Sequence, residues 1–403
     1  METEQPPSSM VAQHIGGIVK ITSVHVHQVS APLNRPFWMS LEPYTTASEL
    51  IVLIETDDGL TGIGEIHGRP MRQIAEIVIG AFAPLLVGQN PMEHERLWSA
   101  MFAFTHTRRG AGLGQAEGQP HFGAGARPQI MAAIAGVDIA LWDLKGKMCG
   151  QSVSRLLGAS RSTVSCYASG GYYGPVGEAD VEGLVAEMTG YTALGFRAVK
   201  MKVGGLSIEE DIVRVRSVRE AIGLDVDLML DANVAYDVPA AIRAARAFEP
   251  FDITWFEEPV HWYDGVFGVA QVAAATTIPI ASGESELHRW GCRDLILHGG
   301  IRVMQFDATR AGGVTEWLRV AAYAANHGIV MAPHHDPQVH GQLIAAIPNG
   351  HVQEVFPNAE RDPLWAELFD GRPEIVDGTL HVPDRPGFGF EVNPAGLQKY
   401  RVG

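Results

Sequence analysis

The order of apolar and polar positions divides the chain into two parts with different patterns. Over residues 18–66, apolar residues alternate with polar ones, and an Asp-Gly pair separates two apolar runs. This pattern is typical of antiparallel strands joined by a tight turn. Residues 72–104 and 129–150 instead carry apolar residues at helical spacing. We therefore predict an α+β domain over residues 18–160, with a loop at 105–128, where glycine is frequent.

Beyond residue 160, short apolar runs alternate with amphipathic helical segments, and most of the runs end in a polar residue. Eight such runs with helices between them predict a (β/α)8 barrel over residues 161–357, with a doubly wound parallel sheet as the alternative. In a barrel, the carboxyl ends of all strands meet at one mouth, where active sites form. The eight runs are VSCYAS (164–169), FRAVKMKV (196–203), VDLMLDA (226–232), ITWFEE (253–258), IPIASGE (278–284), RVMQFD (302–307), GIVMAPH (328–334) and HVQEVF (351–356).

The two ends of the chain differ from these domains. Residues 1–17 are polar and lack the basic and apolar stretches of a signal peptide, so we expect a flexible tail. Residues 358–403 are rich in proline and glycine, with short strand-like runs. We expect this C-terminal segment to pack back onto the α+β domain, which would then form a cap on the barrel.

Composition narrows the range of partners. The net charge of −16 disfavours nucleic acid and anionic membranes, although a bound cation allows a small anionic substrate. No apolar run reaches the length of a membrane span. The three cysteines, Cys149, Cys166 and Cys292, are scattered, so we expect no disulfide framework and a reducing, cytoplasmic location.

Three carboxylates end three consecutive strand-like runs. Glu257 follows Asp231 by 26 residues, and Glu284 follows Glu257 by 27, which is about one βα unit. At a barrel mouth they would repel one another unless a cation lay between them. An all-oxygen set favours Mg²⁺, with Mn²⁺ as a surrogate, and disfavours zinc. Glu258 has the opposite strand parity, so we expect it to support the site without binding the metal.

Other polar residues at strand ends supply candidate acids and bases. Lys200 and Lys202 share one strand face next to Asp231, and a neighbouring cation would lower the pKa of such a lysine toward that of a general base. Asn233 shares the face of Asp231 and is a candidate donor to substrate.

On the other side of the predicted mouth, Asp307 ends the sixth run, and His334 or His335 ends the seventh. An aspartate beside a histidine fixes its tautomer and keeps it basic, but strand alternation does not choose between the two histidines. Glu354 ends the eighth run, where a carboxyl group kept protonated would donate to an oxyanion.

Taken together, these motifs resemble the enolase superfamily, in its mandelate racemase-like subgroup, over roughly residues 18–400. The resemblance rests on the Lys-x-Lys pair at 200 and 202 and on the motifs AGVDIALWDLKGK, DAN, EEP, GES, DATRAGG and MAPH. It implies the capped (β/α)8 barrel fold and a homo-oligomer of even number. It also assigns the metal site to Asp231, Glu257 and Glu284.

The same resemblance implies roles for the remaining polar residues. Lys202 is implied as the base on one face of the substrate, with Lys200 assisting the substrate carboxylate. His334, paired with Asp307, is implied as the second acid/base, and Glu354 as a donor to the enolate. Relatives resembling muconate cycloisomerase place a lysine after the sixth strand, and glucarate dehydratase-like relatives use Asn as the third ligand; this chain has neither feature.

The chemistry that this resemblance implies is removal of a proton α to a carboxylate. We expect a Mg²⁺-dependent dehydratase of an aldonate or aldarate, with a racemase, epimerase or lactone cycloisomerase as the alternative. Polar residues near the predicted mouth suit a polyol. By the resemblance, specificity should lie in two capping segments, residues 33–49 and 66–71, whose arginines suit a second carboxylate. A non-catalytic barrel would be expected to lack a ligand or base, and a metal-dependent hydrolase would use histidine ligands. The candidate substrate-binding residues are Asn233, Arg35, Arg69, Arg310, His261, Tyr263, Ser285, Glu286 and the pair Arg108 and Arg109.

Overall fold

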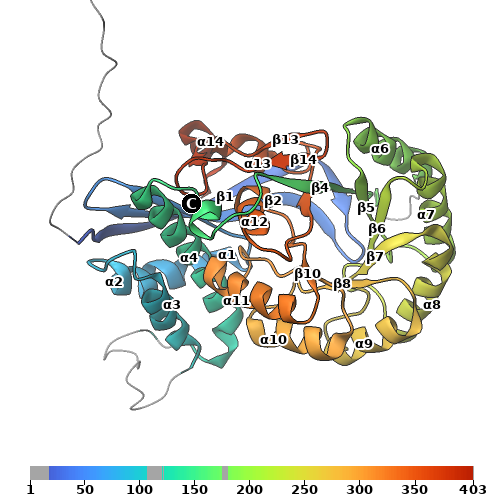
Figure 1. The fold of residues 1–403 in the computed structure, drawn as a ribbon, viewed down its shortest axis with the longest axis horizontal. Helices are drawn as coiled ribbons and strands as arrows, with labels where there is room; N and C mark the ends of the chain where they lie inside the picture. The colour runs from blue at the N-terminus through green and yellow to red at the C-terminus, as the bar shows by residue number, and fades with distance from the viewer. Residues whose placement is uncertain (1–17, 107–119, 121, 175–179, 403) are drawn as a thin grey trace, which may run out of the picture.

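The eight strand-like runs form a closed parallel barrel. This computed structural model describes residues 18–106, 120, 122–174 and 180–402, and Figure 1 shows its fold. Neighbouring barrel strands pair in sequence order, and β11 pairs back with β4. Met331 also bridges Gly350, just before β11. A doubly wound sheet would leave two free edges, so the prediction of a barrel is confirmed. The strands are β4 (Thr163–Gly170), β5 (Ala198–Lys202), β6 (Asp227–Asp231), β7 (Ile253–Glu257), β8 (Ile280–Ser282), β9 (Val303–Met304), β10 (Val330–Met331) and β11 (Gln353–Val355).

Helices follow the strands and form the outer ring of the barrel (Figure 1). Local sequence explains where several begin: Ser207 and Glu210 form a reciprocal capping box on α7, and Asp180 and Asp237 cap α6 and α8. These helices are α6 (Val181–Ala193), α7 (Ile208–Ile222), α8 (Val238–Phe248), α9 (Gly265–Ala275), α10 (Arg289–Asp294), α11 (Gly313–Asn326) and α12 (Pro337–Ala346). Short turns η4 (Glu249–Phe251) and η5 (Leu295–Gly299) continue α8 and α10.

A layer of apolar side chains fills the barrel below the mouth. Each strand, or the residue next to it, contributes one member, as expected for a packed barrel interior. Two large rings meet edge to face, with the centroids of Tyr167 and Trp255 5.3 Å apart. The layer forms the floor beneath the polar residues of the mouth. Its members are Tyr167, Ala198, Met229, Trp255, Ala281, Val303, Ala332 and Val352.

The N-terminal part forms a three-stranded antiparallel sheet backed by a long buried helix, α4. The sheet has the order β1-β2-β3, with the tight turn at the expected place between β2 and β3. Helix α4 lies against β3 so closely that a Cβ on Gly64 would come 1.9 Å from the carbonyl oxygen of Gly136. The elements are β1 (Ile21–Trp38), β2 (Pro43–Thr56), β3 (Thr61–Ile66), α1 (Met71–Ile77), η1 (Val78–Phe82), α2 (Ala83–Leu86), α3 (His94–Phe102), η2 (Ala103–Thr105), η3 (Ala124–Ala126), α4 (Arg127–Cys149) and α5 (Val153–Leu156).

The C-terminal segment contacts both parts of the molecule. Near its end, the backbone N–H of Val402 donates to Gln28 on β1, at 2.9 Å. Its hairpin pairs through β14 with the start of the barrel strand β4, a contact that the sequence did not predict. The elements are α13 (Pro363–Glu367), β12 (Phe369–Asp370), β13 (Glu374–Val376), β14 (Thr379–His381), β15 (Glu391–Val392) and α14 (Pro394–Tyr400).

Some predictions fall on parts of the chain that are not described. Residues 1–17 and most of the 105–128 loop, with Arg108 and Arg109, lie outside the described residues. The three cysteines are free thiols. Within the described ranges, no helix is both long and apolar enough to cross a membrane.

Candidate active site at the barrel mouth

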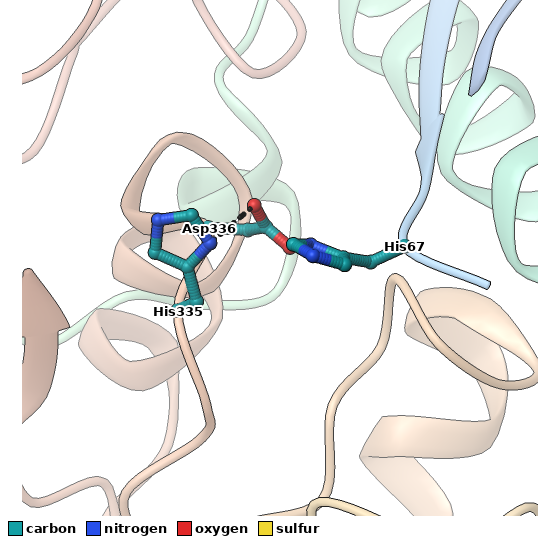
Figure 2. Close-up of side chains that lie close together, drawn as sticks. All are labelled: His67, His335 and Asp336. Atoms are coloured by element: carbon teal, nitrogen blue, oxygen red, sulfur yellow. Dashed lines mark ion pairs between the residues drawn. The ribbon is translucent and has the colours of Figure 1, made fainter. Parts of the chain in front are cut away.

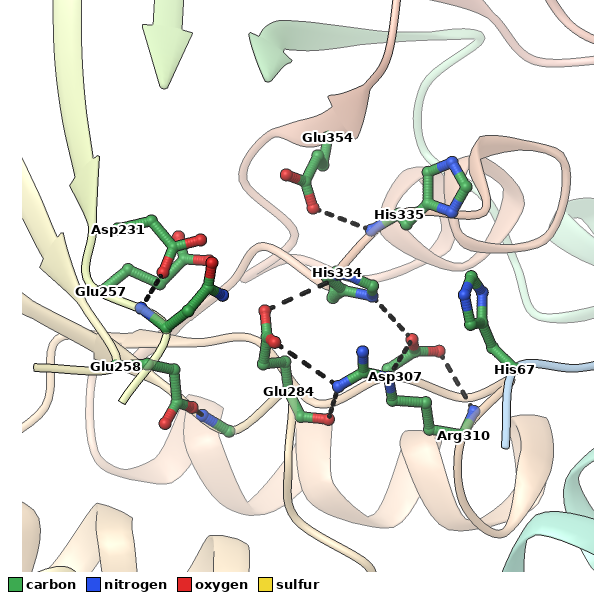
Figure 3. A network of polar contacts seen from close by, with 12 residues as sticks. His67, Asp231, Glu257, Glu258, Glu284, Asp307, Arg310, His334, His335 and Glu354 are labelled. Atoms are coloured by element: carbon green, nitrogen blue, oxygen red, sulfur yellow. Dashed lines mark hydrogen bonds and ion pairs between the residues drawn. The ribbon is translucent and has the colours of Figure 1, made fainter. Parts of the chain in front are cut away.

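The three carboxylates predicted to bind a metal lie together at the barrel mouth (Figure 3). Asp231 and Glu257 are the last residues of β6 and β7, and Glu284 lies two residues after β8. All three are buried, and one carboxylate oxygen from each lies within 4.8 Å of the others. In-register pairing of adjacent parallel strands brings them together, because Asp231 is paired directly with Glu257. The oxygen donors fit a hard dication such as Mg²⁺.

Two buried lysines extend into the same carboxylates from β5. Lys200 Nζ lies 2.6 Å from Glu257 Oε1, and Lys202 is hydrogen-bonded to Asp231. Burial lowers the pKa of each lysine, but the carboxylates outweigh it and hold both pKa values above the ordinary value. Among the protein groups alone, the predicted lowering of the pKa of Lys202 is therefore not found. Sequence reasoning counted the second ammonium group and missed the direct ion pair with Asp231.

His334 and Asp307 form a hydrogen-bonded pair on the opposite side of the carboxylates. His334 Nδ1 lies 2.9 Å from Asp307 Oδ2, and Nε2 lies 4.0 Å from Glu284 Oε2. Burial would raise the pKa of Asp307, but the hydrogen bond with His334 and the nearby His340 hold it below its ordinary value. Thr309 donates its N–H to the other oxygen of Asp307 at 2.7 Å, and its hydroxyl oxygen lies 2.7 Å from the same atom. The aspartate is thereby held in place to orient His334.

The structure separates the two adjacent histidines that the sequence left as alternatives. His334 lies beside Glu284 and Asp307, as described above. His335 has a left-handed backbone, with φ of 45°, and its Nε2 lies 2.9 Å from Asp362 Oδ2. Its ring therefore turns away from the carboxylates of the mouth, as Figure 3 shows. Position and partners thus favour His334 as the acid/base.

Glu354 differs from the prediction of a protonated donor. Its Oε1 lies 2.8 Å from Lys200 Nζ, and its Oε2 accepts a hydrogen bond from the N–H of His335 at 3.0 Å. Burial would raise the pKa of Glu354, but the positive charges of Lys200 and His334 lower it, so the carboxylate form is favoured. The residue is therefore an acceptor in this arrangement. The sequence places Glu354 at the mouth but gives no sign of its partner.

Glu258 supports the mouth from behind, as its strand parity predicted. It accepts hydrogen bonds from Ser282 Oγ at 3.0 Å and from the N–H of Gly283 at 2.9 Å. Burial and the charge of Glu284 raise the pKa of Glu258 to about 7. The hydrogen bonds hold the turn from which Glu284 extends into the site.

The structure places the candidate substrate-binding residues at different distances from the mouth. Arg310 lies at the mouth, with Nη1 3.4 Å from Glu284 Oε1. Asn233 follows the end of β6 with a left-handed backbone, and its N–H donates to Asp231 at 2.8 Å, so strand alternation does not describe its side chain. Arg69 lines a cavity next to the mouth, although its Nη2 donates to the carbonyl of Ser48. Arg35 is exposed on β1 and does not line that cavity, so the structure does not bring it to the mouth.

This cavity lies between the barrel mouth and the cap and has a volume of about 240 Å³. His334 and Arg310 form its boundary with the metal carboxylates. The predicted polyol contacts His261, Tyr263, Ser285 and Glu286 do not line it. Sequence reasoning missed several of its polar side chains, although Glu49 and His67 fall in the two segments, 33–49 and 66–71, that were expected to set specificity. The missed lining residues include Tyr44, Glu49, His67, Asp336, Asp362 and Trp365.

Comparison with known proteins gives matches over nearly the whole chain. The family model for the mandelate racemase/muconate lactonizing enzyme N-terminal domain matches residues 21–158, and the enolase C-terminal domain-like model matches residues 183–396. D-Galactarolactone cycloisomerase of Agrobacterium fabrum is 34% identical over 400 residues, covering 95% of this chain and 99% of its own. Arabinonate dehydratase of Saccharolobus solfataricus is 31% identical, covering 86% and 89%.

Solved structures agree with these matches. A mandelate racemase/muconate lactonizing enzyme from a marine actinobacterium, in complex with magnesium, superposes with a TM-score of 0.81. It is 33% identical, and the match covers 96% of this chain and 100% of that one. L-Talarate dehydratase from Polaromonas sp. JS666, complexed with Mg and L-glucarate, gives a TM-score of 0.79 at 32% identity, covering 96% and 98%. Since both domains match family models and the relatives align over almost their full length, this chain belongs to the enolase superfamily of enzymes, among the proteins similar to mandelate racemase and muconate lactonizing enzyme.

Proposed function

We propose that this protein is a Mg²⁺-dependent dehydratase of an acid sugar, an aldonate or aldarate, and that it forms a 2-keto-3-deoxy acid. The observation that carries the proposal is the placement of two proton-transfer groups at the two ends of the carboxylate row. Lys202 contacts Asp231 at one end, and His334 lies 4.0 Å from Glu284 at the other. A substrate lying over the row would have one group on each side.

The metal would be held by Asp231, Glu257 and Glu284, whose buried oxygens converge. Magnesium is the ion present in the related structures described above. When bound, it supplies positive charge that stabilises the enediolate formed from the substrate carboxylate. Glu258 and the hydrogen bonds that it accepts hold the turn of Glu284 in place for this role.

The chain's own groups account for the proton transfers. In its neutral form, which a dication bound beside Asp231 would favour, Lys202 Nζ takes the α-proton, and the electron pair of the C–H bond moves into the enediolate. The pair then forms the C2–C3 double bond while the C3–O bond breaks. His334 Nε2 gives its proton to the departing hydroxyl, which leaves as water, and the enol becomes the 2-keto-3-deoxy acid. Asp307 holds the tautomer of His334, and Lys200, buried among the carboxylates, lies where it would assist the substrate carboxylate.

The cavity beside the mouth suits a polar chain with several oxygens. Arg310 and Arg69 line it, together with the side chains of Tyr44 and Trp365. The curated relatives, with names such as arabinonate dehydratase, act on acid sugars. Arg69 is a candidate for binding a distal carboxylate, because a guanidinium forms paired hydrogen bonds with that group.

A second candidate reaction is supported by one of the relatives. D-Galactarolactone cycloisomerase aligns over 95% of this chain, more than arabinonate dehydratase does. A lactone whose ring oxygen is the leaving group at C3 would use the same base, and the ring would open without loss of water. A racemase or epimerase would use Lys202 and His334 in turn on opposite faces of one carbon.

The test is proton NMR in D₂O with Mg²⁺, across mono- and diacid sugars and their lactones, with product masses measured in parallel. We expect the substrate signals of one open-chain acid to give way to a 3-deoxy methylene, with a product lighter by one water. A lactone converted at constant mass would favour the cycloisomerase. Exchange of the α-proton without a methylene would favour a racemase or epimerase.

Two variants separate chemistry from binding. Lys202→Met should abolish turnover of the identified substrate while Mg²⁺ still binds. Arg72→Met changes an exposed cation that pairs with Glu76 on the surface, and should leave turnover unchanged. Full activity of Lys202→Met would contradict the proposed base.

A further inference from the structure

A second group of convergent ligand atoms lies on the far side of His334 from the carboxylate row. His67 follows β3, and His335 and Asp336 connect β10 to α12. One ligand atom from each of the three lies within 4.8 Å of the others. Figure 2 shows the two imidazole rings on either side of the Asp336 carboxylate. None of these three residues has a part in the proposed dehydration.

The two imidazole nitrogens that face Asp336 are buried and lack a hydrogen bond of acceptable geometry. Nδ1 of His335 lies 3.2 Å from Asp336 Oδ1, and Nδ1 of His67 lies 3.5 Å from Asp336 Oδ2. His335 is only 7% exposed. Buried polar atoms are normally satisfied, so two such nitrogens directed at one carboxylate need a partner.

The surroundings fix which nitrogen of His335 is available to a metal. Its Nε2 lies 2.9 Å from Asp362 Oδ2, so this nitrogen carries a proton that is donated to the carboxylate. Burial would lower the pKa of His335, but the charges of Asp336 and Asp362 raise it well above the ordinary value, so without a metal Nδ1 is protonated as well, and a cation would bind there by replacing that proton. A carboxylate behind a histidine in this way is the usual arrangement for a metal-binding imidazole.

Two further acids enclose the same group from the cap. Glu49 on β2 and Glu65 on β3 are buried, and both offer an oxygen within 4.8 Å of an oxygen of Asp336. Glu65 Oε1 has no hydrogen-bond partner, whereas its Oε2 accepts from Gln338. Burial, followed by the neighbouring carboxylates, raises the pKa of Glu49 and Glu65 well above the ordinary value. The group thus contains uncompensated acids as well as free nitrogens.

We propose that His67, His335 and Asp336, with Glu49 and Glu65 beside them, form a second cation site that binds a transition-metal dication such as Zn²⁺. Imidazole nitrogens select Zn²⁺, Co²⁺ or Ni²⁺ over Mg²⁺, which prefers six oxygen ligands. The site differs in both residues and ligand type from the carboxylate row. Glu49, His67, His335 and Asp336 line the cavity, so a metal there would face a bound substrate.

The competing explanation is electrostatic and needs no metal. A doubly protonated His335 would pair with Asp336 and Asp362 at once, and protons on Glu49 and Glu65 would remove the remaining repulsion. Direct measurement of metal stoichiometry separates the two explanations, because only the metal site takes up Zn²⁺.

The experiment is equilibrium dialysis of the metal-depleted full chain against Zn²⁺. Zn²⁺ also binds carboxylate oxygens, so at saturating concentration it should fill the carboxylate row as well as the second site. We then expect two equivalents in the wild type, one in His67→Gln, one in Asp231→Asn and none in the double variant. Co²⁺ bound to Asp231→Asn should show the visible absorption bands of a site with nitrogen ligands. Asp362→Asn keeps the oxygen that caps α13 but removes the carboxylate behind His335, and should weaken the second equivalent about 10- to 100-fold.

His25→Gln is the matched control, because His25 also lies beside a carboxylate, Glu55, but on the surface. It should retain both equivalents. One equivalent in both the wild type and His67→Gln would overturn the second site, as would two equivalents in His67→Gln. If His67→Gln fails to fold, His335→Gln decides in the same way, because it removes another of the three ligands. If instead the proposed Mg²⁺ site at the carboxylate row were wrong, Asp231→Asn would bind as much Zn²⁺ as the wild type.

Discussion

At the scale of single residues, the direction of each side chain depends on where its strand ends. Asp231 and Glu257 are the last residues of β6 and β7 and point into the mouth as strand alternation predicts. Beyond the strand ends the backbone turns left-handed at Asn233 and His335, with φ of 40° and 45°. Alternation no longer applies at such residues. Their roles could therefore be derived only from the structure.

The pairing of His334 with Asp307 leads to a prediction at the residue scale. In Asp307→Asn, the amide nitrogen would face His334 Nδ1, and the ring would lose the carboxylate that stabilises its doubly protonated form, the form that donates a proton readily from Nε2. We expect elimination to slow by on the order of 10²–10⁴-fold. Exchange of the α-proton through Lys202 should be retained for the same substrate. Both rates can be followed in one NMR experiment in D₂O.

Asp294→Asn is the control for that substitution, because Asp294 is exposed and pairs with its neighbour Arg293. Equal loss of exchange and elimination in Asp307→Asn would show that the aspartate supports the whole mouth. Wild-type elimination in Asp307→Asn would refute the role assigned to the pair.

At the scale of elements, α4 joins the cap to the barrel. Gly64 on β3 and Gly136 on α4 let the two elements approach within backbone contact. In Gly64→Ala, the new Cβ would lie 1.9 Å from the carbonyl oxygen of Gly136, so the helix must move away from the sheet. We expect a loss of about 3 kcal/mol or more in the free energy of unfolding, at the upper end of overpacking effects. Thermal unfolding of the variant provides the measurement.

Gly80→Ala is its matched control, because a Cβ at this helical glycine meets nothing within 4 Å. Alanine there should be neutral or slightly stabilising, since glycine costs up to about 1 kcal/mol in a helix. A Gly64→Ala variant as stable as Gly80→Ala would mean that α4 and β3 are packed less tightly than described.

Helix α4 also contacts the barrel helix α11 through a buried acid with an unusual pKa. Asp138 accepts hydrogen bonds from the N–H of Thr315 at 2.8 Å and from its hydroxyl at 2.7 Å. Burial raises the pKa of Asp138 to about 7, and these hydrogen bonds only partly oppose the effect. The unfolded value is about 3.9, so the native state binds more protons between these two pH values.

The contribution of Asp138 to stability should therefore fall as pH rises from about 4 to about 7. One pKa unit corresponds to about 1.4 kcal/mol, which gives a loss of up to about 4 kcal/mol. In Asp138→Asn the amide stays neutral, so wild type should exceed the variant in stability by more at pH 5 than at pH 8. Melting temperatures of both proteins, measured between pH 5 and pH 8, test this prediction. A constant difference would mean that Asp138 keeps an ordinary pKa.

At the scale of the whole molecule, the sequence predicted the architecture because barrel geometry converts spacing into position. Equal intervals of one βα unit place Asp231, Glu257 and Glu284 on consecutive strands, and closure of the barrel brings Asp307, His334 and Glu354 around to face them. The cavity was harder to predict, because its walls combine β2, the end of β3 and the C-terminal segment that contains Asp362. These segments meet only through long-range packing, which no local sequence pattern indicates.

The closed barrel also gathers charge that an unfolded chain would keep apart. Four buried carboxylates, from Asp231, Glu257, Glu284 and Glu354, share the mouth with the ammonium groups of Lys200 and Lys202. With all four carboxylates ionised, these six groups carry two negative charges in excess, which is the charge that one dication would balance. Because only the native state assembles this set, binding of Mg²⁺ should stabilise the fold by mass action.

We expect the apparent melting temperature of metal-depleted protein to rise with added Mg²⁺, with about 2.7 kcal/mol of stabilisation at a concentration 100 times the dissociation constant. EDTA should remove both the stabilisation and the turnover, and Mg²⁺ should restore both. Asp231→Asn should show no such rise, whereas Asp294→Asn on the surface should behave as wild type. A melting temperature that does not respond to Mg²⁺, or one that rises equally in Asp231→Asn, would place the ion elsewhere in the molecule.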